Sequence, residues 1–133
     1  MNNTNERLLC RAKTVNYGIW KTGHYMEYRK TPYLRCVIGD TVDVEYRINP
    51  DTLCQCTGLR DKHGALIFEG DIVKVDLKLA KTIFRYGCWM AKSLDGKFLR
   101  DGKSEMIGDI DRNIIEIAGN IFDNPELLEV ESQ

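Results

Sequence analysis

The sequence predicts a mainly β protein that ends in a short helix, and three observations support this fold class. Short segments alternate apolar and polar residues with a period of two, which is the period of a strand with one buried face. Glycine, proline and asparagine divide these segments at short intervals, as turns between strands require. Only the segment near the C-terminus carries signals for the start of a helix.

The first part of the chain, residues 1–52, is predicted to be a strand-rich region. Its clearest pattern is the strict alternation of apolar and charged side chains over residues 42–47. Asn16-Tyr17-Gly18 predicts a turn, Pro32 is expected to interrupt a strand, and Asn49-Pro50-Asp51 closes the region with turn residues. We expect strands at residues 8–15, 24–28, 34–38 and 42–47.

The second part, residues 53–133, predicts further strands around tight turns. His63-Gly64 and Glu69-Gly70-Asp71 supply residues that tolerate the backbone angles of tight turns, and Asp95-Gly96 is typical of a hairpin loop. In residues 72–77 the odd-numbered side chains are all aliphatic and should share the buried face. We expect strands at residues 65–68, 72–77, 82–86, 88–91 and 114–118, with a long loop or a short helix within 99–112.

The C-terminal helix is predicted over residues 125–129. Asn124 is a suitable N-cap, Pro125 suits the first helical position, and Glu126 places negative charge at the positive end of the helix dipole. Leu127 and Leu128 would dock the helix against the strands.

Composition predicts a globular protein of the reducing cytosol. Hydrophobic residues make up 43% of the 133 residues and charged residues 29%, which is ordinary for a folded domain. No apolar stretch approaches the roughly 18 residues of a spanning helix, and residues 1–11 lack the apolar run of a secretion signal. The five cysteines are an odd number without a regular framework, so we expect free thiols and no membrane partner.

The charges are unevenly distributed, although their sum is only −1. In residues 74–103, eight Lys and Arg oppose three Asp, whereas in residues 104–133 one Arg opposes eight acidic residues. Such an asymmetry indicates an interaction surface or two segments that neutralise each other.

The basic segment 74–103 is the candidate binding site, because its cations are interleaved with aromatic residues. A surface that binds single-stranded nucleic acid combines cations for phosphates with rings for base stacking. Against this, aromatic residues of a small β domain usually belong to its core. The candidate binding residues are Lys74, Lys78, Lys81, Arg85, Trp89, Lys92 and Arg100.

No pattern in the sequence predicts catalysis, a metal or a cofactor. Cys54 and Cys56 lie two apart, so in a strand their Cα atoms are about 7 Å apart on one face, too far for an easy disulfide. Only His24 and His63 remain as scattered metal ligands, which favours buried structural thiols over a zinc site. Motifs for phosphate binding or nucleophilic catalysis are not found. We therefore predict a non-enzymatic protein without cofactor or metal.

Two runs carry a resemblance to a known family. The first is QCTGLRDKHG followed by IFEGDIVKV, in residues 55–75, and the second is IAGNIFDNPELL, in residues 117–128. They resemble the YopX family, and the run CRAK at residues 10–13 is similar to that family's opening strand. The resemblance does not extend to residues 78–113. Within it, Gly58, Gly64 and Gly70 predict tight turns, while Asp61 and Asp71 predict carboxylates that bind nearby amides.

The resemblance implies a phage or prophage accessory protein whose residues 53–133 form an SH3-like barrel with the C-terminal helix. It implies no established activity. We expect protein binding or self-assembly in the cytoplasm of a bacterial host, with a host protein or a second copy as partner. Single-stranded nucleic acid bound through residues 74–103 is the alternative that we favour less.

An enzymatic alternative rests on residues 70–77, which resemble the first strand of ribonuclease toxins of the MazF and PemK type. Those toxins also use an SH3-like barrel, but their strand opens the chain and is followed by a loop with proline and arginine. In this chain seventy residues come first, and no proline follows residue 77 before Pro125. We rank the toxin below the binding functions.

Overall fold

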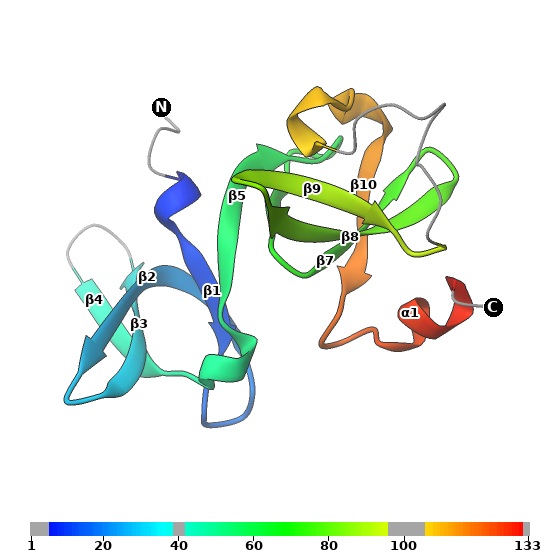
Figure 1. Ribbon diagram of the computed structural model, residues 1–133. Coiled ribbons are helices and arrows are strands. Elements are labelled where there is room, and N and C mark those ends of the chain that lie inside the picture. Colours follow the sequence, from blue (N-terminus) through cyan, green and yellow to red (C-terminus); the bar gives the residue numbers. More distant parts are fainter. Residues whose placement is uncertain (1–5, 39–41, 96–105, 132–133) are drawn as a thin grey trace. The chain divides into compact units, whose positions relative to one another are not determined.

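The computed structural model describes residues 6–38, 42–95 and 106–131, and within them it confirms the predicted mainly β fold with a short C-terminal helix (Figure 1). The strands belong to two antiparallel sheets. The chain divides into two compact units, Met1–Gly58 (unit 1) and Leu59–Gln133 (unit 2), and each is described by itself. The predicted boundary between residues 52 and 53, and the closure of the second part as an SH3-like barrel, stay predictions.

Unit 1 is an antiparallel sheet that closes on itself. Thr14 and Ile48 form an isolated bridge, and the amide of Val15 donates to the carbonyl of Arg47 at 2.9 Å, so the end of β4 meets the continuation of β1. The neighbours in the sheet are β4, β3, β2, β1 and β5, in this order. The elements are η1 (Glu6–Leu8), β1 (Cys10–Lys13), β2 (Trp20–Tyr28), β3 (Thr31–Ile38), β4 (Val42–Arg47), η2 (Pro50–Thr52) and β5 (Cys54–Arg60), the last of which crosses into unit 2.

The closed sheet of unit 1 surrounds a small core of Ala12, Leu34, Cys36 and Ile48. The prediction that Pro32 interrupts a strand is wrong, because Pro32 lies inside β3 opposite Glu27. The reversal occurs instead at Arg29 and Lys30, which both have positive φ angles of 51° and 65°. A two-residue hairpin loop needs such angles, but neither residue signals them in the sequence.

Unit 2 contains a four-stranded sheet with the order β10, β7, β8, β9. A short strand, β6, pairs with β5 next to it. The elements of this unit are β6 (Leu66–Phe68), β7 (Asp71–Val75), β8 (Lys78–Arg85), β9 (Cys88–Ser93), η3 (Ile107–Asp109), η4 (Arg112–Ile114), β10 (Ile115–Asn120) and α1 (Glu126–Glu131).

One face of this sheet carries the core of unit 2. Val73 and Val75 of β7 are buried there with Ile67, Ala80 and other aliphatic side chains, as the alternation predicts. The burial of Ile72 was not predicted, and the expectation that Leu77 shares the buried face is wrong. Ile72 is also fully buried, although it lies on the other face, and Leu77 is 91% exposed, because the chain already turns at Asp76, where φ is 54°.

The glycines of the central motif have different roles. Gly64 and Gly70 adopt positive φ angles at turns, as predicted. Gly58 also has a positive φ angle, of 80°, but it lies inside β5 rather than at a turn, and a Cβ atom there would be 3.2 Å from the Cβ atom of Arg7. The hairpin between β8 and β9 turns at Tyr86-Gly87, between the two predicted strands. The expected hairpin turn at Asp95-Gly96 stays a prediction, because Gly96 lies outside the described residues.

The connection from β10 to α1 is a turn held by asparagine side chains. The Asn120 side chain accepts hydrogen bonds from the amides of Phe122 and Asp123, each at 2.9 Å. The Asn124 side chain accepts from the amide of Asn120 at 3.1 Å, so it binds the turn before the helix. A Cβ atom at Gly119 would be only 2.4 Å from Asn124 Oδ1, which explains why a glycine stands there. None of the described helices is long and apolar enough to cross a membrane.

Replacing Gly119 should therefore destabilise the protein. We expect Gly119→Ala to lower the free energy of unfolding by about 1–3 kcal/mol, because the new methyl group overlaps Asn124 in a packed turn. Gly108→Ala is the control, since no atom lies within 4 Å of its Cβ position. Urea unfolding measures both, and equal midpoints for the two variants would contradict this account of the turn.

Candidate functional site

The predicted binding residues lie on the three strands β7, β8 and β9, but they do not share one face. Lys81 lies opposite both Ile72 and Lys92 in the register. Because neighbouring residues of a strand point to opposite faces, Lys74, Lys81, Arg85 and Lys92 share one face and Lys78 and Trp89 lie on the other. Arg100 lies outside the described residues.

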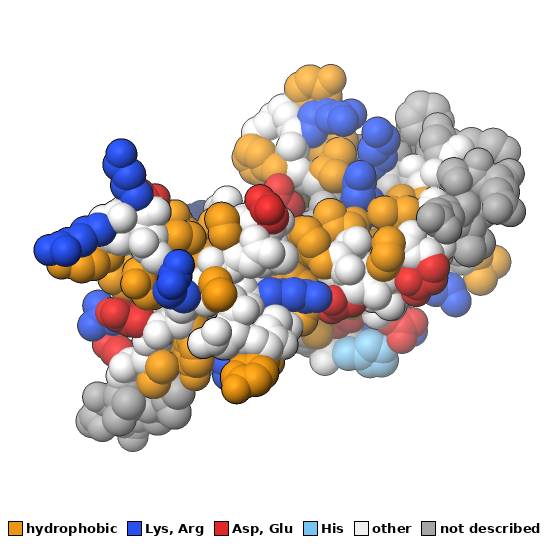
Figure 2. Space-filling view, turned by 90° about the horizontal axis from the view of Figure 1, so that it is seen from below, with side chains coloured by type: hydrophobic (Ala, Val, Ile, Leu, Met, Phe, Trp, Pro, Cys, Tyr) orange, Lys and Arg blue, Asp and Glu red, His pale blue; other side chains and the backbone are white. Residues whose placement is uncertain are grey.

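The side chains of Trp89 and Lys78 already make contacts within unit 2. Trp89 packs against the core, with its ring centroid 4.9 Å from that of Phe84. Lys78 Nζ is 3.1 Å from Asp95 Oδ2. On the face shown in Figure 2, Lys and Arg side chains are interspersed with hydrophobic and uncharged ones and form no continuous stripe. The structure therefore separates the main ring of the predicted site from most of its cations, and a binding role for these residues stays a prediction.

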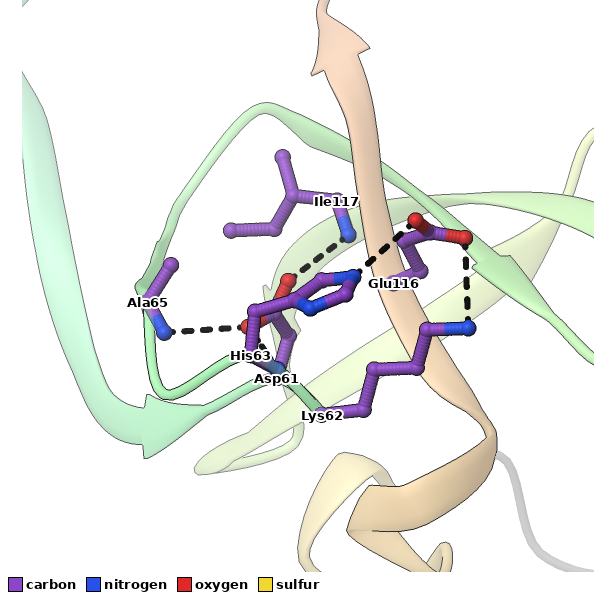
Figure 3. A network of polar contacts seen from close by, with 6 residues as sticks. All are labelled: Asp61, Lys62, His63, Ala65, Glu116 and Ile117. Atoms are coloured by element: carbon purple, nitrogen blue, oxygen red, sulfur yellow. Dashed lines mark hydrogen bonds and ion pairs between the residues drawn. The ribbon is translucent and has the colours of Figure 1, made fainter.

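Backbone amides of the central motif and of β10 converge on one buried carboxylate, that of Asp61 (Figure 3). Asp61 Oδ1 accepts hydrogen bonds from the amides of His63 and Ala65, at 2.9 and 3.0 Å. Asp61 Oδ2 accepts from the amide of Ile117 in β10, at 3.1 Å. The side chain thus closes its own turn and also attaches that turn to a strand more than fifty residues away.

The backbone of the same turn is attached to the end of unit 2 as well. The amide of Lys62 donates to the carbonyl of Ile115 at 2.8 Å, and Arg112 Nε donates to the carbonyl of Asp61 at 3.0 Å. Asp61 is only 2% exposed. Burial would raise the pKa of its carboxyl group, but the three amides and the charge of His63 outweigh burial and hold this pKa below its usual range.

A second carboxylate, that of Glu116, lies at the surface beside this turn. Its Oε2 is 3.1 Å from Nε2 of His63, and its Oε1 is 3.5 Å from Nζ of Lys62. The hydrogen bond with His63, followed by the charge of Lys62, holds the pKa of Glu116 below its usual range. His63, Lys62 and Glu116 form an exposed ion-pair cluster around a structural turn.

The two family-like runs meet in space. The amide of Ile121 donates to the carbonyl of Gly70 at 2.9 Å, and a Cβ atom at Gly70 would touch Ile121 and Phe122. Asp71, which is buried, accepts from the amide of Phe68 at 2.8 Å. The side chains of Asp61, Asp71, Asn120 and Asn124 thus bind backbone groups of their own unit, as expected for the carboxylates of Asp61 and Asp71.

The cysteines and histidines form no metal site in the part of the chain that the structure describes. No group of three or more His, Cys, Asp or Glu there could hold a metal ion. Each of the five cysteines is a thiol and not half of a disulfide, Cys54 and Cys56 are buried, and burial raises the pKa of the Cys36 thiol. His24 and His63 are exposed.

A concave site that sequence reasoning missed lies in unit 1. The pocket has a volume of about 470 Å³ and lies between the loop that follows β1 and the end of β4. Three tyrosines, one lysine, one arginine and one glutamate line it, and the alternation along β4 puts Tyr46 on the opposite face of that strand from Glu45 and Arg47. We call it the tyrosine pocket, after Tyr17, Lys21, Tyr33, Glu45, Tyr46 and Arg47.

The tyrosine pocket combines exposed rings with fixed cations. Tyr17 is 94% exposed at the tip of its loop, and the Nζ atom of Lys21 lies 4.8 Å from the ring centroid of Tyr46. Arg47 lies opposite Tyr33 in the register of β3 and β4. No local motif marks these residues, because they come together only when the sheet closes at Thr14 and Ile48.

Together, the two antiparallel sheets, their separate cores and the backbone-binding motif residues define a small β protein built from two units. The family model described as YopX protein matches residues 6–129. The chain therefore belongs to the YopX family, which confirms the resemblance and extends it across residues 78–113. A search of the curated proteins finds no match.

Removing the charge of Asp61 should destabilise the protein at neutral pH. We expect Asp61→Asn to cost about 1–3 kcal/mol, because an amide group would turn donors towards the backbone amides. Since the folded pKa is lowered, the stabilisation is complete above the unfolded value of about 3.9 and is lost as the pH falls through the folded pKa. Unfolding curves recorded from neutral to acidic pH should thus converge for the variant and the wild type.

The control is Asp76→Asn, which changes an exposed carboxylate at a positive φ angle that asparagine tolerates. This variant should stay within about 0.5 kcal/mol of the wild type. An Asp61→Asn variant that is as stable as this control at neutral pH would refute the structural role of the carboxylate.

The surface cluster gives a separate prediction about Glu116. His63→Ala should raise the pKa of Glu116 towards its ordinary value, and it should do so more than Lys62→Ala does, because the hydrogen bond with His63 is the larger cause. Nuclear magnetic resonance titration of the Glu116 carboxyl carbon measures both shifts. A larger rise in the Lys62→Ala variant would show that the order of these causes is wrong.

Proposed function

We propose that this YopX family member is a non-enzymatic accessory protein of a phage or prophage that works by binding a partner through the tyrosine pocket of unit 1. The observation that carries the proposal is the pocket itself, which presents tyrosine rings and cations in a concavity of about 470 Å³. This volume lies within the range of roughly 300–1,000 Å³ typical of ligand sites.

The polar residues of the family-like runs support the non-enzymatic part of the proposal. An acid or base in catalysis must be able to reach a substrate. The carboxylate of Asp61 is instead buried against three backbone amides, and that of Asp71 is buried against the amide of Phe68. A structural role is therefore enough to explain why the chain has these two carboxylates. A ribonuclease would need residues other than Asp61 and Asp71 as its catalytic acid and base.

Exposed apolar side chains beside the pocket support binding to a macromolecule. Val15, Tyr17 and Ile19 follow one another on the same loop with at least half of each side chain exposed. Such a group of apolar side chains on a small surface is typical of an interaction site. Both another protein chain, including a second copy, and a nucleic acid satisfy this proposal. Five cysteines that form no disulfide among the described residues fit a cytosolic location.

The proposal predicts that a partner depends on the pocket. Three tagged proteins are expressed in bacterial cytosol and isolated: the wild type and two double variants. The first double variant is Tyr17→Ala/Arg47→Ala, and the second is Tyr86→Ala/Lys81→Ala. Light scattering detects a second copy, mass spectrometry detects other proteins, and the ultraviolet absorbance spectrum detects nucleic acid. We expect Tyr17→Ala/Arg47→Ala to retain less partner than the wild type, by a factor of at least about five. The reason is that the loss of one good contact costs more than about 1 kcal/mol of binding free energy.

The second double variant is the control, because it removes one exposed tyrosine and one lysine of unit 2. It should retain as much partner as the wild type. The absence of any partner, or an equal loss in both variants, would refute the use of the pocket. Cleavage of RNA by the purified wild type would refute the non-enzymatic part.

A further inference from the structure

Unit 1 holds most of the tyrosines and has a positive balance of charge, whereas unit 2 has a negative one. Residues 1–58 contain five of the six tyrosines and eight Lys and Arg against six Asp and Glu, a balance of +2. Residues 59–133 contain eleven Lys and Arg against fourteen Asp and Glu, a balance of −3. A polyanion is therefore attracted to unit 1 and repelled by unit 2.

The ring of Tyr17 is available to a ligand. It is 94% exposed, so it contributes little packing to unit 1. Tyr17 also adopts a φ angle of 70°, a conformation that bulky residues rarely adopt, next to Gly18 at 59°. The loop that presents the ring is held at its base, where the amide of Thr14 donates to the carbonyl of Ile19 at 2.9 Å and the amide of Ile19 donates to the Thr14 hydroxyl at 3.1 Å.

The cations of the pocket are placed for an anion. Lys21 lies over the ring of Tyr46, which fixes the position of its charge without neutralising it. The guanidinium of Arg47 makes no ion pair or hydrogen bond with the described residues. Lys13 lines an adjoining pocket that shares Thr14 and Arg47 with this one. In the two adjoining pockets together, three cations oppose one acidic side chain, Glu45.

From these observations we propose that the tyrosine pocket binds single-stranded nucleic acid, an inference that rests on the proposed function. Bases stack on the rings of Tyr17 and Tyr33, while Arg47 and Lys21 bind phosphates. Stacking on rings beside a basic surface is how proteins bind single strands without reading their sequence. A duplex buries the faces of its bases, so it offers nothing to stack on Tyr17. A protein partner would use the apolar loop but would leave Arg47 without a counterion unless it were acidic.

The test is fluorescence anisotropy with labelled oligonucleotides of about 12 bases, of deoxythymidine and of uridine, and with a duplex of equal length. We expect both single strands to bind more tightly than the duplex and to weaken as salt rises from about 50 to 200 mM. The ratio of the two single-strand affinities distinguishes DNA from RNA as the preferred ligand. Tyr17→Ala should weaken binding about 5- to 100-fold, and Arg47→Ala should lower the salt slope by about one.

Tyr86→Ala is a closely matched control. Tyr86 is 89% exposed and has a φ angle of 55° before Gly87, so it occupies the same kind of turn as Tyr17, but in unit 2. Lys81→Ala is the corresponding control for Arg47, and both controls should bind within about twofold of the wild type. If the controls lose binding and the pocket variants retain it, the site is the β7–β9 surface, and the inference is wrong.

Failure of the inference is distinguishable from failure of the proposed function. If no single strand binds at about 50 mM salt, but a second copy or another protein is retained by the wild type and lost in Tyr17→Ala/Arg47→Ala, the pocket is a protein-binding site. Only the nucleic-acid inference is then overturned. If neither kind of partner depends on the pocket, both are overturned.

Discussion

The fold of unit 2 depends on the buried carboxylate of Asp61. A charge removed from water is tolerated only when hydrogen bonds replace its hydration, and three backbone amides do so here. Two of these amides belong to the turn of Asp61, and the third, that of Ile117, belongs to β10. The same side chain therefore fixes the geometry of its own turn and the pairing of that turn with β10. When either arrangement is lost, backbone amides of the other lose their hydrogen-bond acceptor.

This arrangement explains why the two family-like runs belong together. Gly70 and Ile121 join the runs a second time, and Asn120 and Asn124 hold the turn that leads into α1. Each of these polar side chains is already used by the backbone. The recurring residues of a family can thus preserve a scaffold while the binding chemistry lies on surfaces outside the motif, and in this chain the concave surface with exposed rings is in unit 1.

Much of the fold could be predicted, because strand period and turn residues are local signals. Every predicted strand corresponds to an observed one, whereas the turn at Arg29 and Lys30 was missed because neither residue favours a positive φ angle. The site was harder. The separation of Trp89 from Lys81 and Lys92 depends on placing the hairpin at Tyr86-Gly87, which fixes the register of β8 and β9. The tyrosine pocket depends on sheet closure between Thr14 and Ile48, a contact between distant residues that no period in the sequence reveals.

The two exposed tyrosine turns show why exposure alone does not define a site. Tyr17 and Tyr86 share the positive φ angle, the following glycine and the exposed ring, so their local chemistry is the same. They differ in what surrounds them: Tyr17 lines a pocket with Tyr33, Tyr46 and two cations, whereas Tyr86 lies at a hairpin tip in the acidic unit. A single stacked ring gives little affinity, and only rings and charges that act on the same polymer add up to binding. The closure of the sheet in unit 1, rather than any one residue, is therefore what brings an exposed tyrosine into the proposed binding site.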